Sequence, residues 1–442
     1  MSLYLIAGLG KTGLSVARYL QKRSKDFIFF DTREMPPDLP EIRAKFSTQI
    51  FLQHIPPDLY PKISEIIISP GVPLDNDNIK KAIDLNIPVR SDIEWFAREQ
   101  QAPVIAITGT NGKSTVTTLV GDILKAASKR VAVCGNIGTP VLDLLDDGGH
   151  YDIWVLELSS FQLETTYSLE PIAATILNIT PDHFDRHHTF AAYKKIKQQI
   201  YSNAKNIIYN RDDASTFPDI SQTSSIVSFG LDTPEYGQWG ILKKNSEIYL
   251  TYNDTYLISV NELKIKGKHN WQNALAACAL TQFVGIDHQY MVAVLNSFTG
   301  LPHRSQLVRT INQVDWINDS KGTNIGATIS SLVGLGDAIT GKIVLIAGGQ
   351  GKGADFNALR DSVQNYVRSI ILIGEDADKI AIALQDIVNI YRAKSLQEAV
   401  QIAKSIAIPQ DIVLLSPACA SYDMFNDFNH RGDCFIEVVN AL

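Results

Sequence analysis

Short hydrophobic runs alternate with amphipathic stretches in the N-terminal part of the chain. Apolar runs at residues 4–7, 27–30 and 65–68 predict buried strands, and the spacing of apolar positions over residues 14–22 predicts a helix between the first two. Strands that are separated by helices in this way are typical of parallel βαβ units.

The same alternation begins again in the middle of the chain. A second series of strands is predicted at residues 103–107, 131–134, 153–157 and 174–179, and a glycine-rich turn after the first of them leads into a helix that ends near residue 126. Residues 223–257 differ, because short strands and turns follow one another directly there. We predict an antiparallel patch for that segment.

A third series follows residue 313, with strands predicted at residues 316–318, 342–347, 367–373 and 411–415. The chain has 442 residues, and at roughly 150 residues per domain this length agrees with three domains. We therefore predict three α/β domains in series, over residues 1–93, 94–300 and 301–442.

Composition and charge narrow the possible partners. With 40 basic and 47 acidic side chains the net charge is −7, which gives no overall attraction to nucleic acid. The four cysteines are scattered without the spacing of a zinc site or a disulfide framework, so reduced thiols in a cytosol fit best. We expect no signal peptide, because the apolar stretch at residues 3–7 is short and no basic region precedes it, and no apolar run reaches the ~20 residues that cross a bilayer. We expect a cytoplasmic protein that binds neither nucleic acid nor membrane.

The strongest motif is a phosphate-binding loop between a predicted strand and a predicted helix. Glycines let backbone N–H groups turn toward an anion, the helix N-terminus adds partial positive charge, and a lysine can reach the outer phosphates while a serine binds Mg²⁺. Ile107 stands where the usual pattern has a glycine, so the loop is a shorter variant. A glycine-rich turn without a ligand is the alternative. The loop residues are Gly109, Thr110, Asn111, Gly112, Lys113, Ser114 and Thr115.

Metal-binding side chains follow the next strands. Glu157 ends an apolar strand, and His183 comes shortly after the following one. Ligands gather at the carboxyl ends of parallel strands, so both side chains are placed to meet a metal beside the phosphate loop. Among the lysines that follow, Lys194 and Lys195 are interpreted as a solvated helix face.

A second glycine motif lies at the N-terminus. Residues 8–13 fit G-x-G-x-x-G, and Asp31 ends the next strand, which by itself indicates a dinucleotide site. The motif is weak, because any diphosphate can bind at such a turn. A tight strand–helix turn without a ligand is the structural alternative.

These motifs, in their order and spacing, resemble the Mur ligase family over essentially the whole chain. The residues that carry the resemblance are 109–115, 157–162, 178–183, 267–270, 273–277, 301–304 and 318–324. The resemblance implies a Rossmann-like N-terminal domain, a P-loop-type central ATPase domain and a Rossmann-like C-terminal domain. It also implies an ATP-dependent ligase that activates a carboxylate as an acyl-phosphate before an amine attacks.

The resemblance implies roles for residues around the phosphate loop. Two Mg²⁺ ions are expected, one held by Ser114 and Glu157, the other by Glu157, His183 and Lys197 as a carbamate. Lys113, Glu157, His183 and Lys197 would form the catalytic centre. The nucleotide of ATP would lie near Asn270, Asn273, Arg304 and Asp319. A helix-capping role for Asn270 and an interdomain ion pair for Arg304 are the structural alternatives.

By the same resemblance the N-terminal glycines bind a UDP-sugar. Gly10, Lys11 and Thr12 would contact its diphosphate, Asp31, Thr32 and Arg33 its uracil, and Ser69 and Gly71 would line the same pocket. The acceptor end of this substrate would be positioned by Asn136, Ser159, Gln162 and His183.

Residues 348–356 and 415–425 of the last domain, which both follow predicted strands, resemble the D-glutamate-adding branch of the family. Thr323, Lys352, Ser421 and Phe428 would hold D-glutamate, since a distal carboxylate needs a positive charge and a directed donor. The substrates would be UDP-N-acetylmuramoyl-L-alanine and D-glutamate, and a monomer is expected. A sister ligase for another amino acid, a folate polyglutamate ligase, an NAD-dependent dehydrogenase and a non-catalytic nucleotide-binding module stay open as alternatives.

Overall fold

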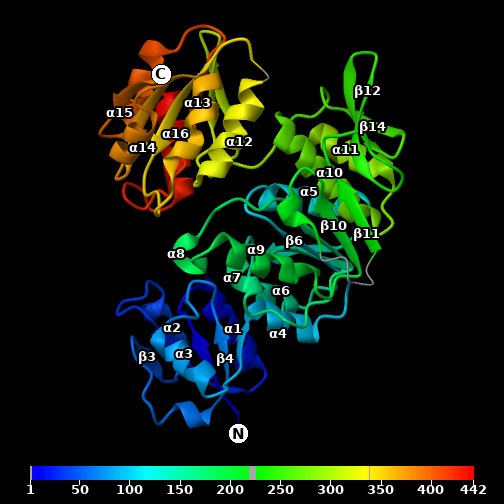
Figure 1. Cartoon of the computed structure of the whole chain (residues 1–442). Helices are drawn as coiled ribbons and strands as arrows, with labels where there is room; N and C mark the ends of the chain where they lie inside the picture. The colour runs from blue at the N-terminus through cyan, green and yellow to red at the C-terminus, as the bar shows by residue number, and fades with distance from the viewer. Residues whose placement is uncertain (1, 219–224, 338) are drawn as a thin grey trace.

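The computed structural model describes residues 2–218, 225–337 and 339–442, except for the side chain of Asp185. In this part of the chain three sheets follow one another from the N-terminus to the C-terminus, each covered by helices (Figure 1). The three series of strands predicted from the hydrophobic pattern are therefore confirmed: each series forms a sheet of its own.

The N-terminal sheet has five parallel strands in the order β3-β2-β1-β4-β5. Neighbouring strands β2 and β4 lie on opposite sides of β1, so the loops after β1 and β4 part at this point and leave room for a ligand. The strands are β1 Leu3–Ala7, β2 Asp26–Asp31, β3 Ile50–Leu52, β4 Ile63–Ile68 and β5 Val89–Ser91, and the helices are α1 Lys11–Lys22, α2 Leu39–Lys45, α3 Asp77–Asp84 and the 3-10 turn Tyr60–Lys62.

The central sheet has nine strands in the order β14-β13-β12-β11-β10-β9-β6-β8-β7. The antiparallel patch predicted for residues 223–257 is partly wrong: β12, β13 and β14 are antiparallel, but β11 pairs parallel with β10. The six-residue β12 and β13 form the expected hairpin, whereas β11 follows a crossover from β10. The strands are β6 Val104–Thr108, β7 Val131–Gly135, β8 Ile153–Glu157, β9 Ala173–Ile176, β10 Asn206–Asn210, β11 Ser225–Phe229, β12 Trp239–Lys244, β13 Glu247–Tyr252 and β14 Thr255–Ser259.

Helices cover both faces of this central sheet. The longest, α5 and α10, pack against each other through a cluster that includes Leu119, Ile123 and Ala276. The helices are α4 Asp92–Glu99, α5 Lys113–Ala126, α6 Val141–Leu145, α7 Ser160–Leu163, α8 Phe184–His187, α9 Phe190–Gln198, α10 Lys268–Gln282, α11 His288–Ser297 and the 3-10 turns Gln199–Tyr201 and Ala214–Thr216.

The C-terminal sheet has the order β15-β16-β20-β17-β18-β19, with only the edge strand β15 antiparallel. The strands are β15 Gln306–Ile311, β16 Val314–Asn318, β17 Ile343–Gly348, β18 Val367–Ile373, β19 Asn389–Arg392 and β20 Ile412–Leu415. The helices are α12 Ile325–Gly336, α13 Arg360–Tyr366, α14 Ala377–Leu384, α15 Leu396–Ile406, α16 Phe428–Asn440 and the 3-10 turn Phe356–Leu359.

The N-terminal and central domains share one hydrophobic cluster, whereas the C-terminal domain has separate clusters. Phe96 of α4 packs edge-on against Trp154 of β8, with 4.8 Å between ring centroids. Arg18 of α1 donates two hydrogen bonds to Asp143 of α6, at 2.9 and 2.6 Å. We expected the first domain to end at residue 93, and this residue lies within α4. The C-terminal core consists of two further clusters around β16–β20.

We expect Gly13→Ala to destabilise the N-terminal domain. Gly13 packs α1 against the end of β1, and a Cβ there would lie 2.0 Å from the carbonyl oxygen of Gly8. Helix and strand would have to separate, at a cost of about 2 kcal/mol. Gly71→Ala is the matched control, because no heavy atom lies within 4 Å of a Cβ at Gly71. Thermal unfolding should show a lower midpoint for Gly13→Ala only; equal midpoints for the two variants would contradict this packing.

Candidate functional site

The phosphate loop has the context that the sequence predicts, between β6 and α5. Gly109 and Gly112 have φ angles of 154° and 82°, which a side chain would strain. Asn178, which follows β9, fixes the loop: its carbonyl oxygen accepts from the N–H of Thr110 at 2.9 Å, and its Oδ1 accepts from the N–H of Asn111 at 2.8 Å. The segment after β9 therefore fixes the conformation of the phosphate loop.

Sheet register brings the other predicted groups to this loop. Strand β6 lies between β8 and β9, so that Ile107 pairs with Glu157 and Thr108 pairs with Ile176. The segments that leave these three strands, which carry the phosphate loop, Glu157 and His183, must then meet at one edge of the sheet.

Two lysine side chains converge on the loop. Lys113 Nζ donates to the carbonyl oxygens of Gly109 and Thr110, at 2.9 Å each. Lys197 Nζ, from α9, donates to the same Gly109 oxygen at 2.9 Å and to Thr108 Oγ1 at 3.3 Å. Burial lowers the pKa of both amines, and the charge of Lys113 lowers that of Lys197 further. Lys197 is only 1% exposed, so burial makes its amine easier to deprotonate than that of an exposed lysine.

Glu157 is buried beside these lysines, with one oxygen unsatisfied. Its Oε1 accepts from Asn136 Nδ2 at 2.8 Å, while Oε2 has no hydrogen-bond partner among the described residues. An unpaired buried carboxylate oxygen is costly, and a hard cation is a suitable partner for it. No group of three or more His, Cys, Asp or Glu side chains is placed to hold a metal in the described part of the chain. The predicted set contains only one Glu and one His, completed by a serine and a modified lysine.

A cavity of about 390 Å³, here called the phosphate-loop cavity, lies between the central and C-terminal domains. It brings together most of the residues predicted for the catalytic centre, the acceptor and D-glutamate. These are Thr110, Asn111, Gly112, Lys113, Ser114, Asn136, Glu157, Ser159, His183, Lys197, Arg304, Thr323, Lys352, Ser421 and Phe428.

The C-terminal part of this cavity is also explained by register. Asn318 pairs with Leu415, and Leu415 pairs with Ile346, so β16, β20 and β17 end side by side. Three of the residues predicted for D-glutamate lie in the loops after these strands: Thr323, Lys352 and Ser421. The fourth, Phe428, begins α16. Lys352 adopts a left-handed backbone with a φ angle of 51° in its loop.

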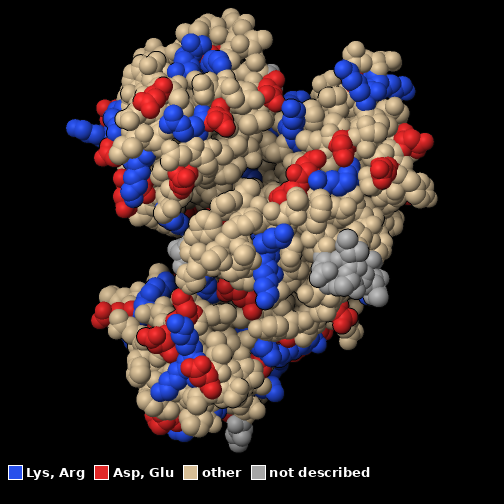
Figure 2. All heavy atoms as spheres, in the orientation of Figure 1, with Lys and Arg blue, Asp and Glu red and all other residues tan. Residues whose placement is uncertain are grey.

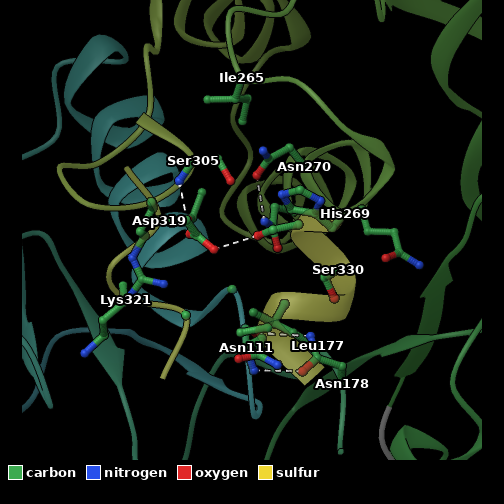
Figure 3. Close-up of a pocket in the computed structure, with 18 of the residues that line it drawn as sticks. Asn111, Leu177, Asn178, Ile265, His269, Asn270, Ser305, Asp319, Lys321 and Ser330 are labelled. Carbon is green, nitrogen blue, oxygen red and sulfur yellow. Dashed lines mark hydrogen bonds between the residues drawn. The ribbon is translucent and has the colours of Figure 1, made fainter. Parts of the chain in front are cut away.

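A second cavity of about 190 Å³, here called the α10 cavity, continues from the same loop. It contains the residues predicted for the nucleotide: Asn270, Asn273, Arg304 and Asp319, beside Asn111, Gly112 and Thr115. Figure 3 shows Asp319 and Lys321 of the C-terminal domain on one side of this cavity and Asn270 and His269 of α10 on the other. Asn111 and Asn178 lie below them in this view.

Arg304 forms a contact between the two domains, whereas Asp319 is hydrogen-bonded within the C-terminal domain. Arg304 Nη2 donates to Ser114 Oγ at 2.8 Å, across the domain boundary. Burial raises the pKa of Asp319, although the hydroxyls of Ser331 and Ser416 donate to its Oδ2 at 2.7 and 2.8 Å. The interdomain ion pair considered for Arg304 is therefore not what the structure shows, because its partner is a hydroxyl.

Lys321 is a site residue to which the sequence reasoning assigned no role, although it lies in the motif at residues 318–324. Its side chain lines both cavities, and its Nζ lies 3.7 Å above the ring centroid of Phe428. Burial, with the nearby charges of Arg304 and Lys113, lowers the pKa of Lys321 to about 8. The signal that could have found it is its position in the sequence, between Asp319 and Thr323, which were both assigned a role.

The residues predicted for UDP lie elsewhere and line neither cavity. Gly10, Lys11, Thr12, Asp31, Thr32, Arg33, Ser69 and Gly71 surround the ends of β1, β2 and β4. Burial alone would raise the pKa of Asp31, but hydrogen bonds from Arg33 and from the N–H of Leu9 hold it below the usual value. Arg33 thus binds Asp31 in this structure.

Gln162 also lies outside both cavities. It forms a reciprocal cap with Ser159, whose Oγ accepts from the N–H of Gln162 at 3.2 Å. It therefore supports Ser159, which does line the phosphate-loop cavity. His187 is buried, and its Nε2 lies 2.9 Å from Ser160 Oγ.

On the face drawn in Figure 2, basic and acidic side chains are interspersed over all three domains. Lys197 is instead buried at the phosphate loop, and Lys113 is half-buried beside it. None of the helices in the described residues has the length and apolar character that crossing a membrane requires.

Comparison with known proteins gives three matches in sequence order. The family model described as "Mur ligase MurD-like, N-terminal domain" matches residues 2–91, "Mur ligase middle domain" matches residues 107–281, and "Mur ligase, glutamate ligase domain" matches residues 303–419. A protein of Legionella pneumophila (strain Paris), named UDP-N-acetylmuramoylalanine--D-glutamate ligase, is 58% identical over 444 residues, covering 100% of this chain and 99% of its own. The chain belongs to the Mur ligase family.

Other relatives agree with this membership. A Pseudomonas aeruginosa protein of the same name is 45% identical over 99% of this chain and 98% of its own length. Among solved structures, the MurF ligase of Thermotoga maritima in complex with ADP has a TM-score of 0.64 at 15% identity, covering 99% of this chain and 94% of its own. UDP-N-acetylmuramate-alanine ligase MurC of the same organism has a TM-score of 0.61 at 19% identity, covering 100% and 99%. At these identities the structures show the three-domain fold.

Binding of ADP is expected to weaken as the pH rises from 7 to 9. Lys321, with its pKa near 8, is protonated and positive below that pH and loses the charge above it. Losing one charge-assisted hydrogen bond should lower the affinity about tenfold. Calorimetric titration of ADP should show this decline in the unmodified protein, while Lys321→Arg keeps its charge and should bind with little dependence on pH. The same decline in Lys321→Arg would assign it to another group.

Proposed function

We propose that this Mur ligase joins D-glutamate to UDP-N-acetylmuramoyl-L-alanine, with ATP activating the alanyl carboxylate as an acyl-phosphate. The observation that carries the proposal is the phosphate-loop cavity, where the phosphate loop faces Lys352, Ser421 and Thr323 of the C-terminal domain. The curated relatives at 58% and 45% identity bear the name of this ligase over their full length. Within the family, this is the activity that the cavity and the relatives jointly favour.

Activation by ATP follows from the chemistry of amide formation. A free carboxylate resists attack by an amine because oxide is a poor leaving group, and transfer of a phosphoryl group replaces it with phosphate. Negative charge then accumulates at the transferring group, and cations around the phosphate loop stabilise it. Lys113, Arg304 and Lys321 line the phosphate-loop cavity and can supply such positive charge.

The donor set at the loop fits two Mg²⁺ ions. The unpaired Oε2 of Glu157 needs a cationic partner, and Ser114 Oγ and His183 line the same cavity. Lys197 would join them as a carbamate: burial shifts its amine toward the neutral form that adds CO₂, and the carbamate, formed with loss of one proton, would place a negative charge beside Lys113. Bound there, the ions would neutralise charge on the phosphates.

The nucleotide would extend into the α10 cavity. Asn270 and Asn273 offer amide groups, and Asn273 Nδ2 already donates to Asn270 Oδ1 at 3.1 Å, so the pair presents a fixed polar surface. Gly112 leaves no space for a Cβ, which would lie 2.5 Å from Asn273 Oδ1. Thr115 and Asp319 complete this part of the site.

The acceptor would run from the N-terminal domain to the phosphate loop. Its UDP part would bind at the ends of β1, β2 and β4, with Lys11 and Thr12 at the start of α1, where a diphosphate meets the positive end of the helix. Asn136, Ser159 and His183 would position the alanyl carboxylate in the phosphate-loop cavity. Gln162 acts through Ser159.

D-Glutamate would bind on the C-terminal side of the same cavity. Lys352 supplies positive charge and Ser421 a hydroxyl donor for the side-chain carboxylate, with Thr323 and Phe428 beside them. Contacts between domains, such as Asn324 Nδ2 donating to Asp182 Oδ2 at 3.0 Å, would keep water from the acyl-phosphate. One chain supplies every side of the cavity, so a monomer suffices, and a cytoplasmic location suits these substrates.

Carbamylation of Lys197 predicts an observable modification. In buffer with ¹³C-bicarbonate, carbon NMR should show a carbamate signal that Lys197→Arg lacks and that the exposed control Lys195→Arg retains. Lys197→Ala should lose phosphate release and regain part of it with a short carboxylic acid. A signal that survives in Lys197→Arg would show that the modification lies elsewhere.

The function is tested by phosphate release from ATP with paired substrates. With UDP-N-acetylmuramoyl-L-alanine, we expect release with D-glutamate and not with L-alanine, diaminopimelate or D-alanyl-D-alanine. Release that requires another amino acid or a folate acceptor would move the assignment to a sister ligase. No release with any pair, together with hydride transfer to NAD, would support the dehydrogenase that the N-terminal glycines alone indicate.

A further inference from the structure

A buried arginine joins two loops of the C-terminal domain. Arg431 lies in α16 and is 1% exposed. Its Nη2 donates to the carbonyl oxygen of Ser320 at 2.8 Å and its Nε to Ser320 Oγ at 3.0 Å. Nη1 and Nη2 both donate to the carbonyl oxygen of Cys419, at 3.2 Å each. One guanidinium therefore fixes the loop after β16 to the loop after β20.

The charge of Arg431 has no carboxylate partner. In the described part of the chain it forms no ion pair, and the carboxylates whose charge acts on it are those of Asp423 and Asp319. Burial lowers its pKa to about 10, so it stays protonated at neutral pH. A buried cation that is hydrogen-bonded only to neutral oxygens makes its surroundings favourable for an anion.

The two loops that Arg431 joins lead directly to the proposed glutamate site. Ser320 precedes Lys321 and Thr323, and Cys419 precedes Ser421 by two residues. Ser320 Oγ also donates to the carbonyl oxygen of Phe428 at 2.8 Å, one helical turn before Arg431. The side chains of Lys321, Thr323, Ser421 and Phe428 all line the phosphate-loop cavity. Arg431 thus helps to fix their spacing, together with the N–H of Ala418, which donates to the carbonyl oxygen of Gly322 at 2.9 Å.

We propose that Arg431 is a positioning residue for the amino-acid substrate: it holds the Ser320 and Cys419 loops at the spacing that D-glutamate requires, and its unpaired charge favours the substrate carboxylate. The inference rests on the proposed function. Lysine cannot replace the planar fork, because one ammonium cannot bridge both carbonyl groups and Ser320 Oγ in fixed directions.

The test compares Michaelis constants in Arg431→Lys, Ser320→Ala and the unmodified protein, measured by phosphate release. Losing directed hydrogen bonds from a charged group should raise the KM for D-glutamate about tenfold in Arg431→Lys and less in Ser320→Ala. The KM values for ATP and the UDP-substrate should stay within about twofold. Arg309→Lys is the matched control: this exposed arginine donates to the carbonyl oxygen of Asn440, at the other end of α16, at 3.2 Å. It should leave all three constants unchanged.

The outcomes separate this inference from the proposed function. If the unmodified protein releases phosphate without needing D-glutamate, the proposed function fails, and the role of Arg431 with it. If it needs D-glutamate but the variants raise all three KM values together, or lower only kcat, Arg431 is structural and the inference is overturned. Should thermal unfolding show that Arg431→Lys does not fold, Ser320→Ala decides, because it removes only the hydroxyl.

Discussion

Two lysine amines, that of the half-buried Lys113 and that of the buried Lys197, donate to one carbonyl oxygen, that of Gly109. Two ammonium groups cannot share such a position in a low dielectric without a large cost, so at least one amine must lose its charge or acquire an anionic partner. The unpaired oxygen of Glu157 has the opposite need in the same cavity. The charges of these side chains are therefore unbalanced until phosphates and cations bind at the phosphate loop. A carbamate on Lys197 would remove one of the two ammonium groups and would supply, together with Glu157, anionic oxygen ligands for Mg²⁺.

The fold delivers this arrangement through strand ends. In the central sheet β6 lies between β8 and β9, and in the C-terminal sheet β20 lies between β16 and β17, so each sheet brings three loops to one edge. The two edges face each other across the phosphate-loop cavity. Left-handed backbone at His183, Lys352 and Ala418, where side chains rarely adopt it, lies in these loops. Such conformations cost stability and persist where the surroundings fix them, as they do at ligand sites.

Much of this could be predicted from the sequence, because the strands are continuous apolar runs and the motifs follow them directly. The parallel pairing of β11 could not, since alternating short strands give no signal for a crossover. Short strands such as β3 and β5 were missed because three residues carry too little pattern. Lys321 and Arg431 were missed for a different reason: their roles depend on burial and on contacts between segments distant in sequence, about which local spacing says nothing.

The central claim is that a triphosphate and two divalent cations meet a substrate carboxylate beside Lys113, Glu157, His183 and Lys197. Crystals grown with Mn²⁺, a non-hydrolysable ATP analogue and the UDP-substrate test it most directly, by anomalous scattering at the manganese edge. The account predicts two peaks, one in contact with Ser114 and Glu157 and the other with Glu157, His183 and a carboxylated Lys197. Absence of any peak at Glu157, or a triphosphate bound outside the phosphate-loop cavity, would contradict it.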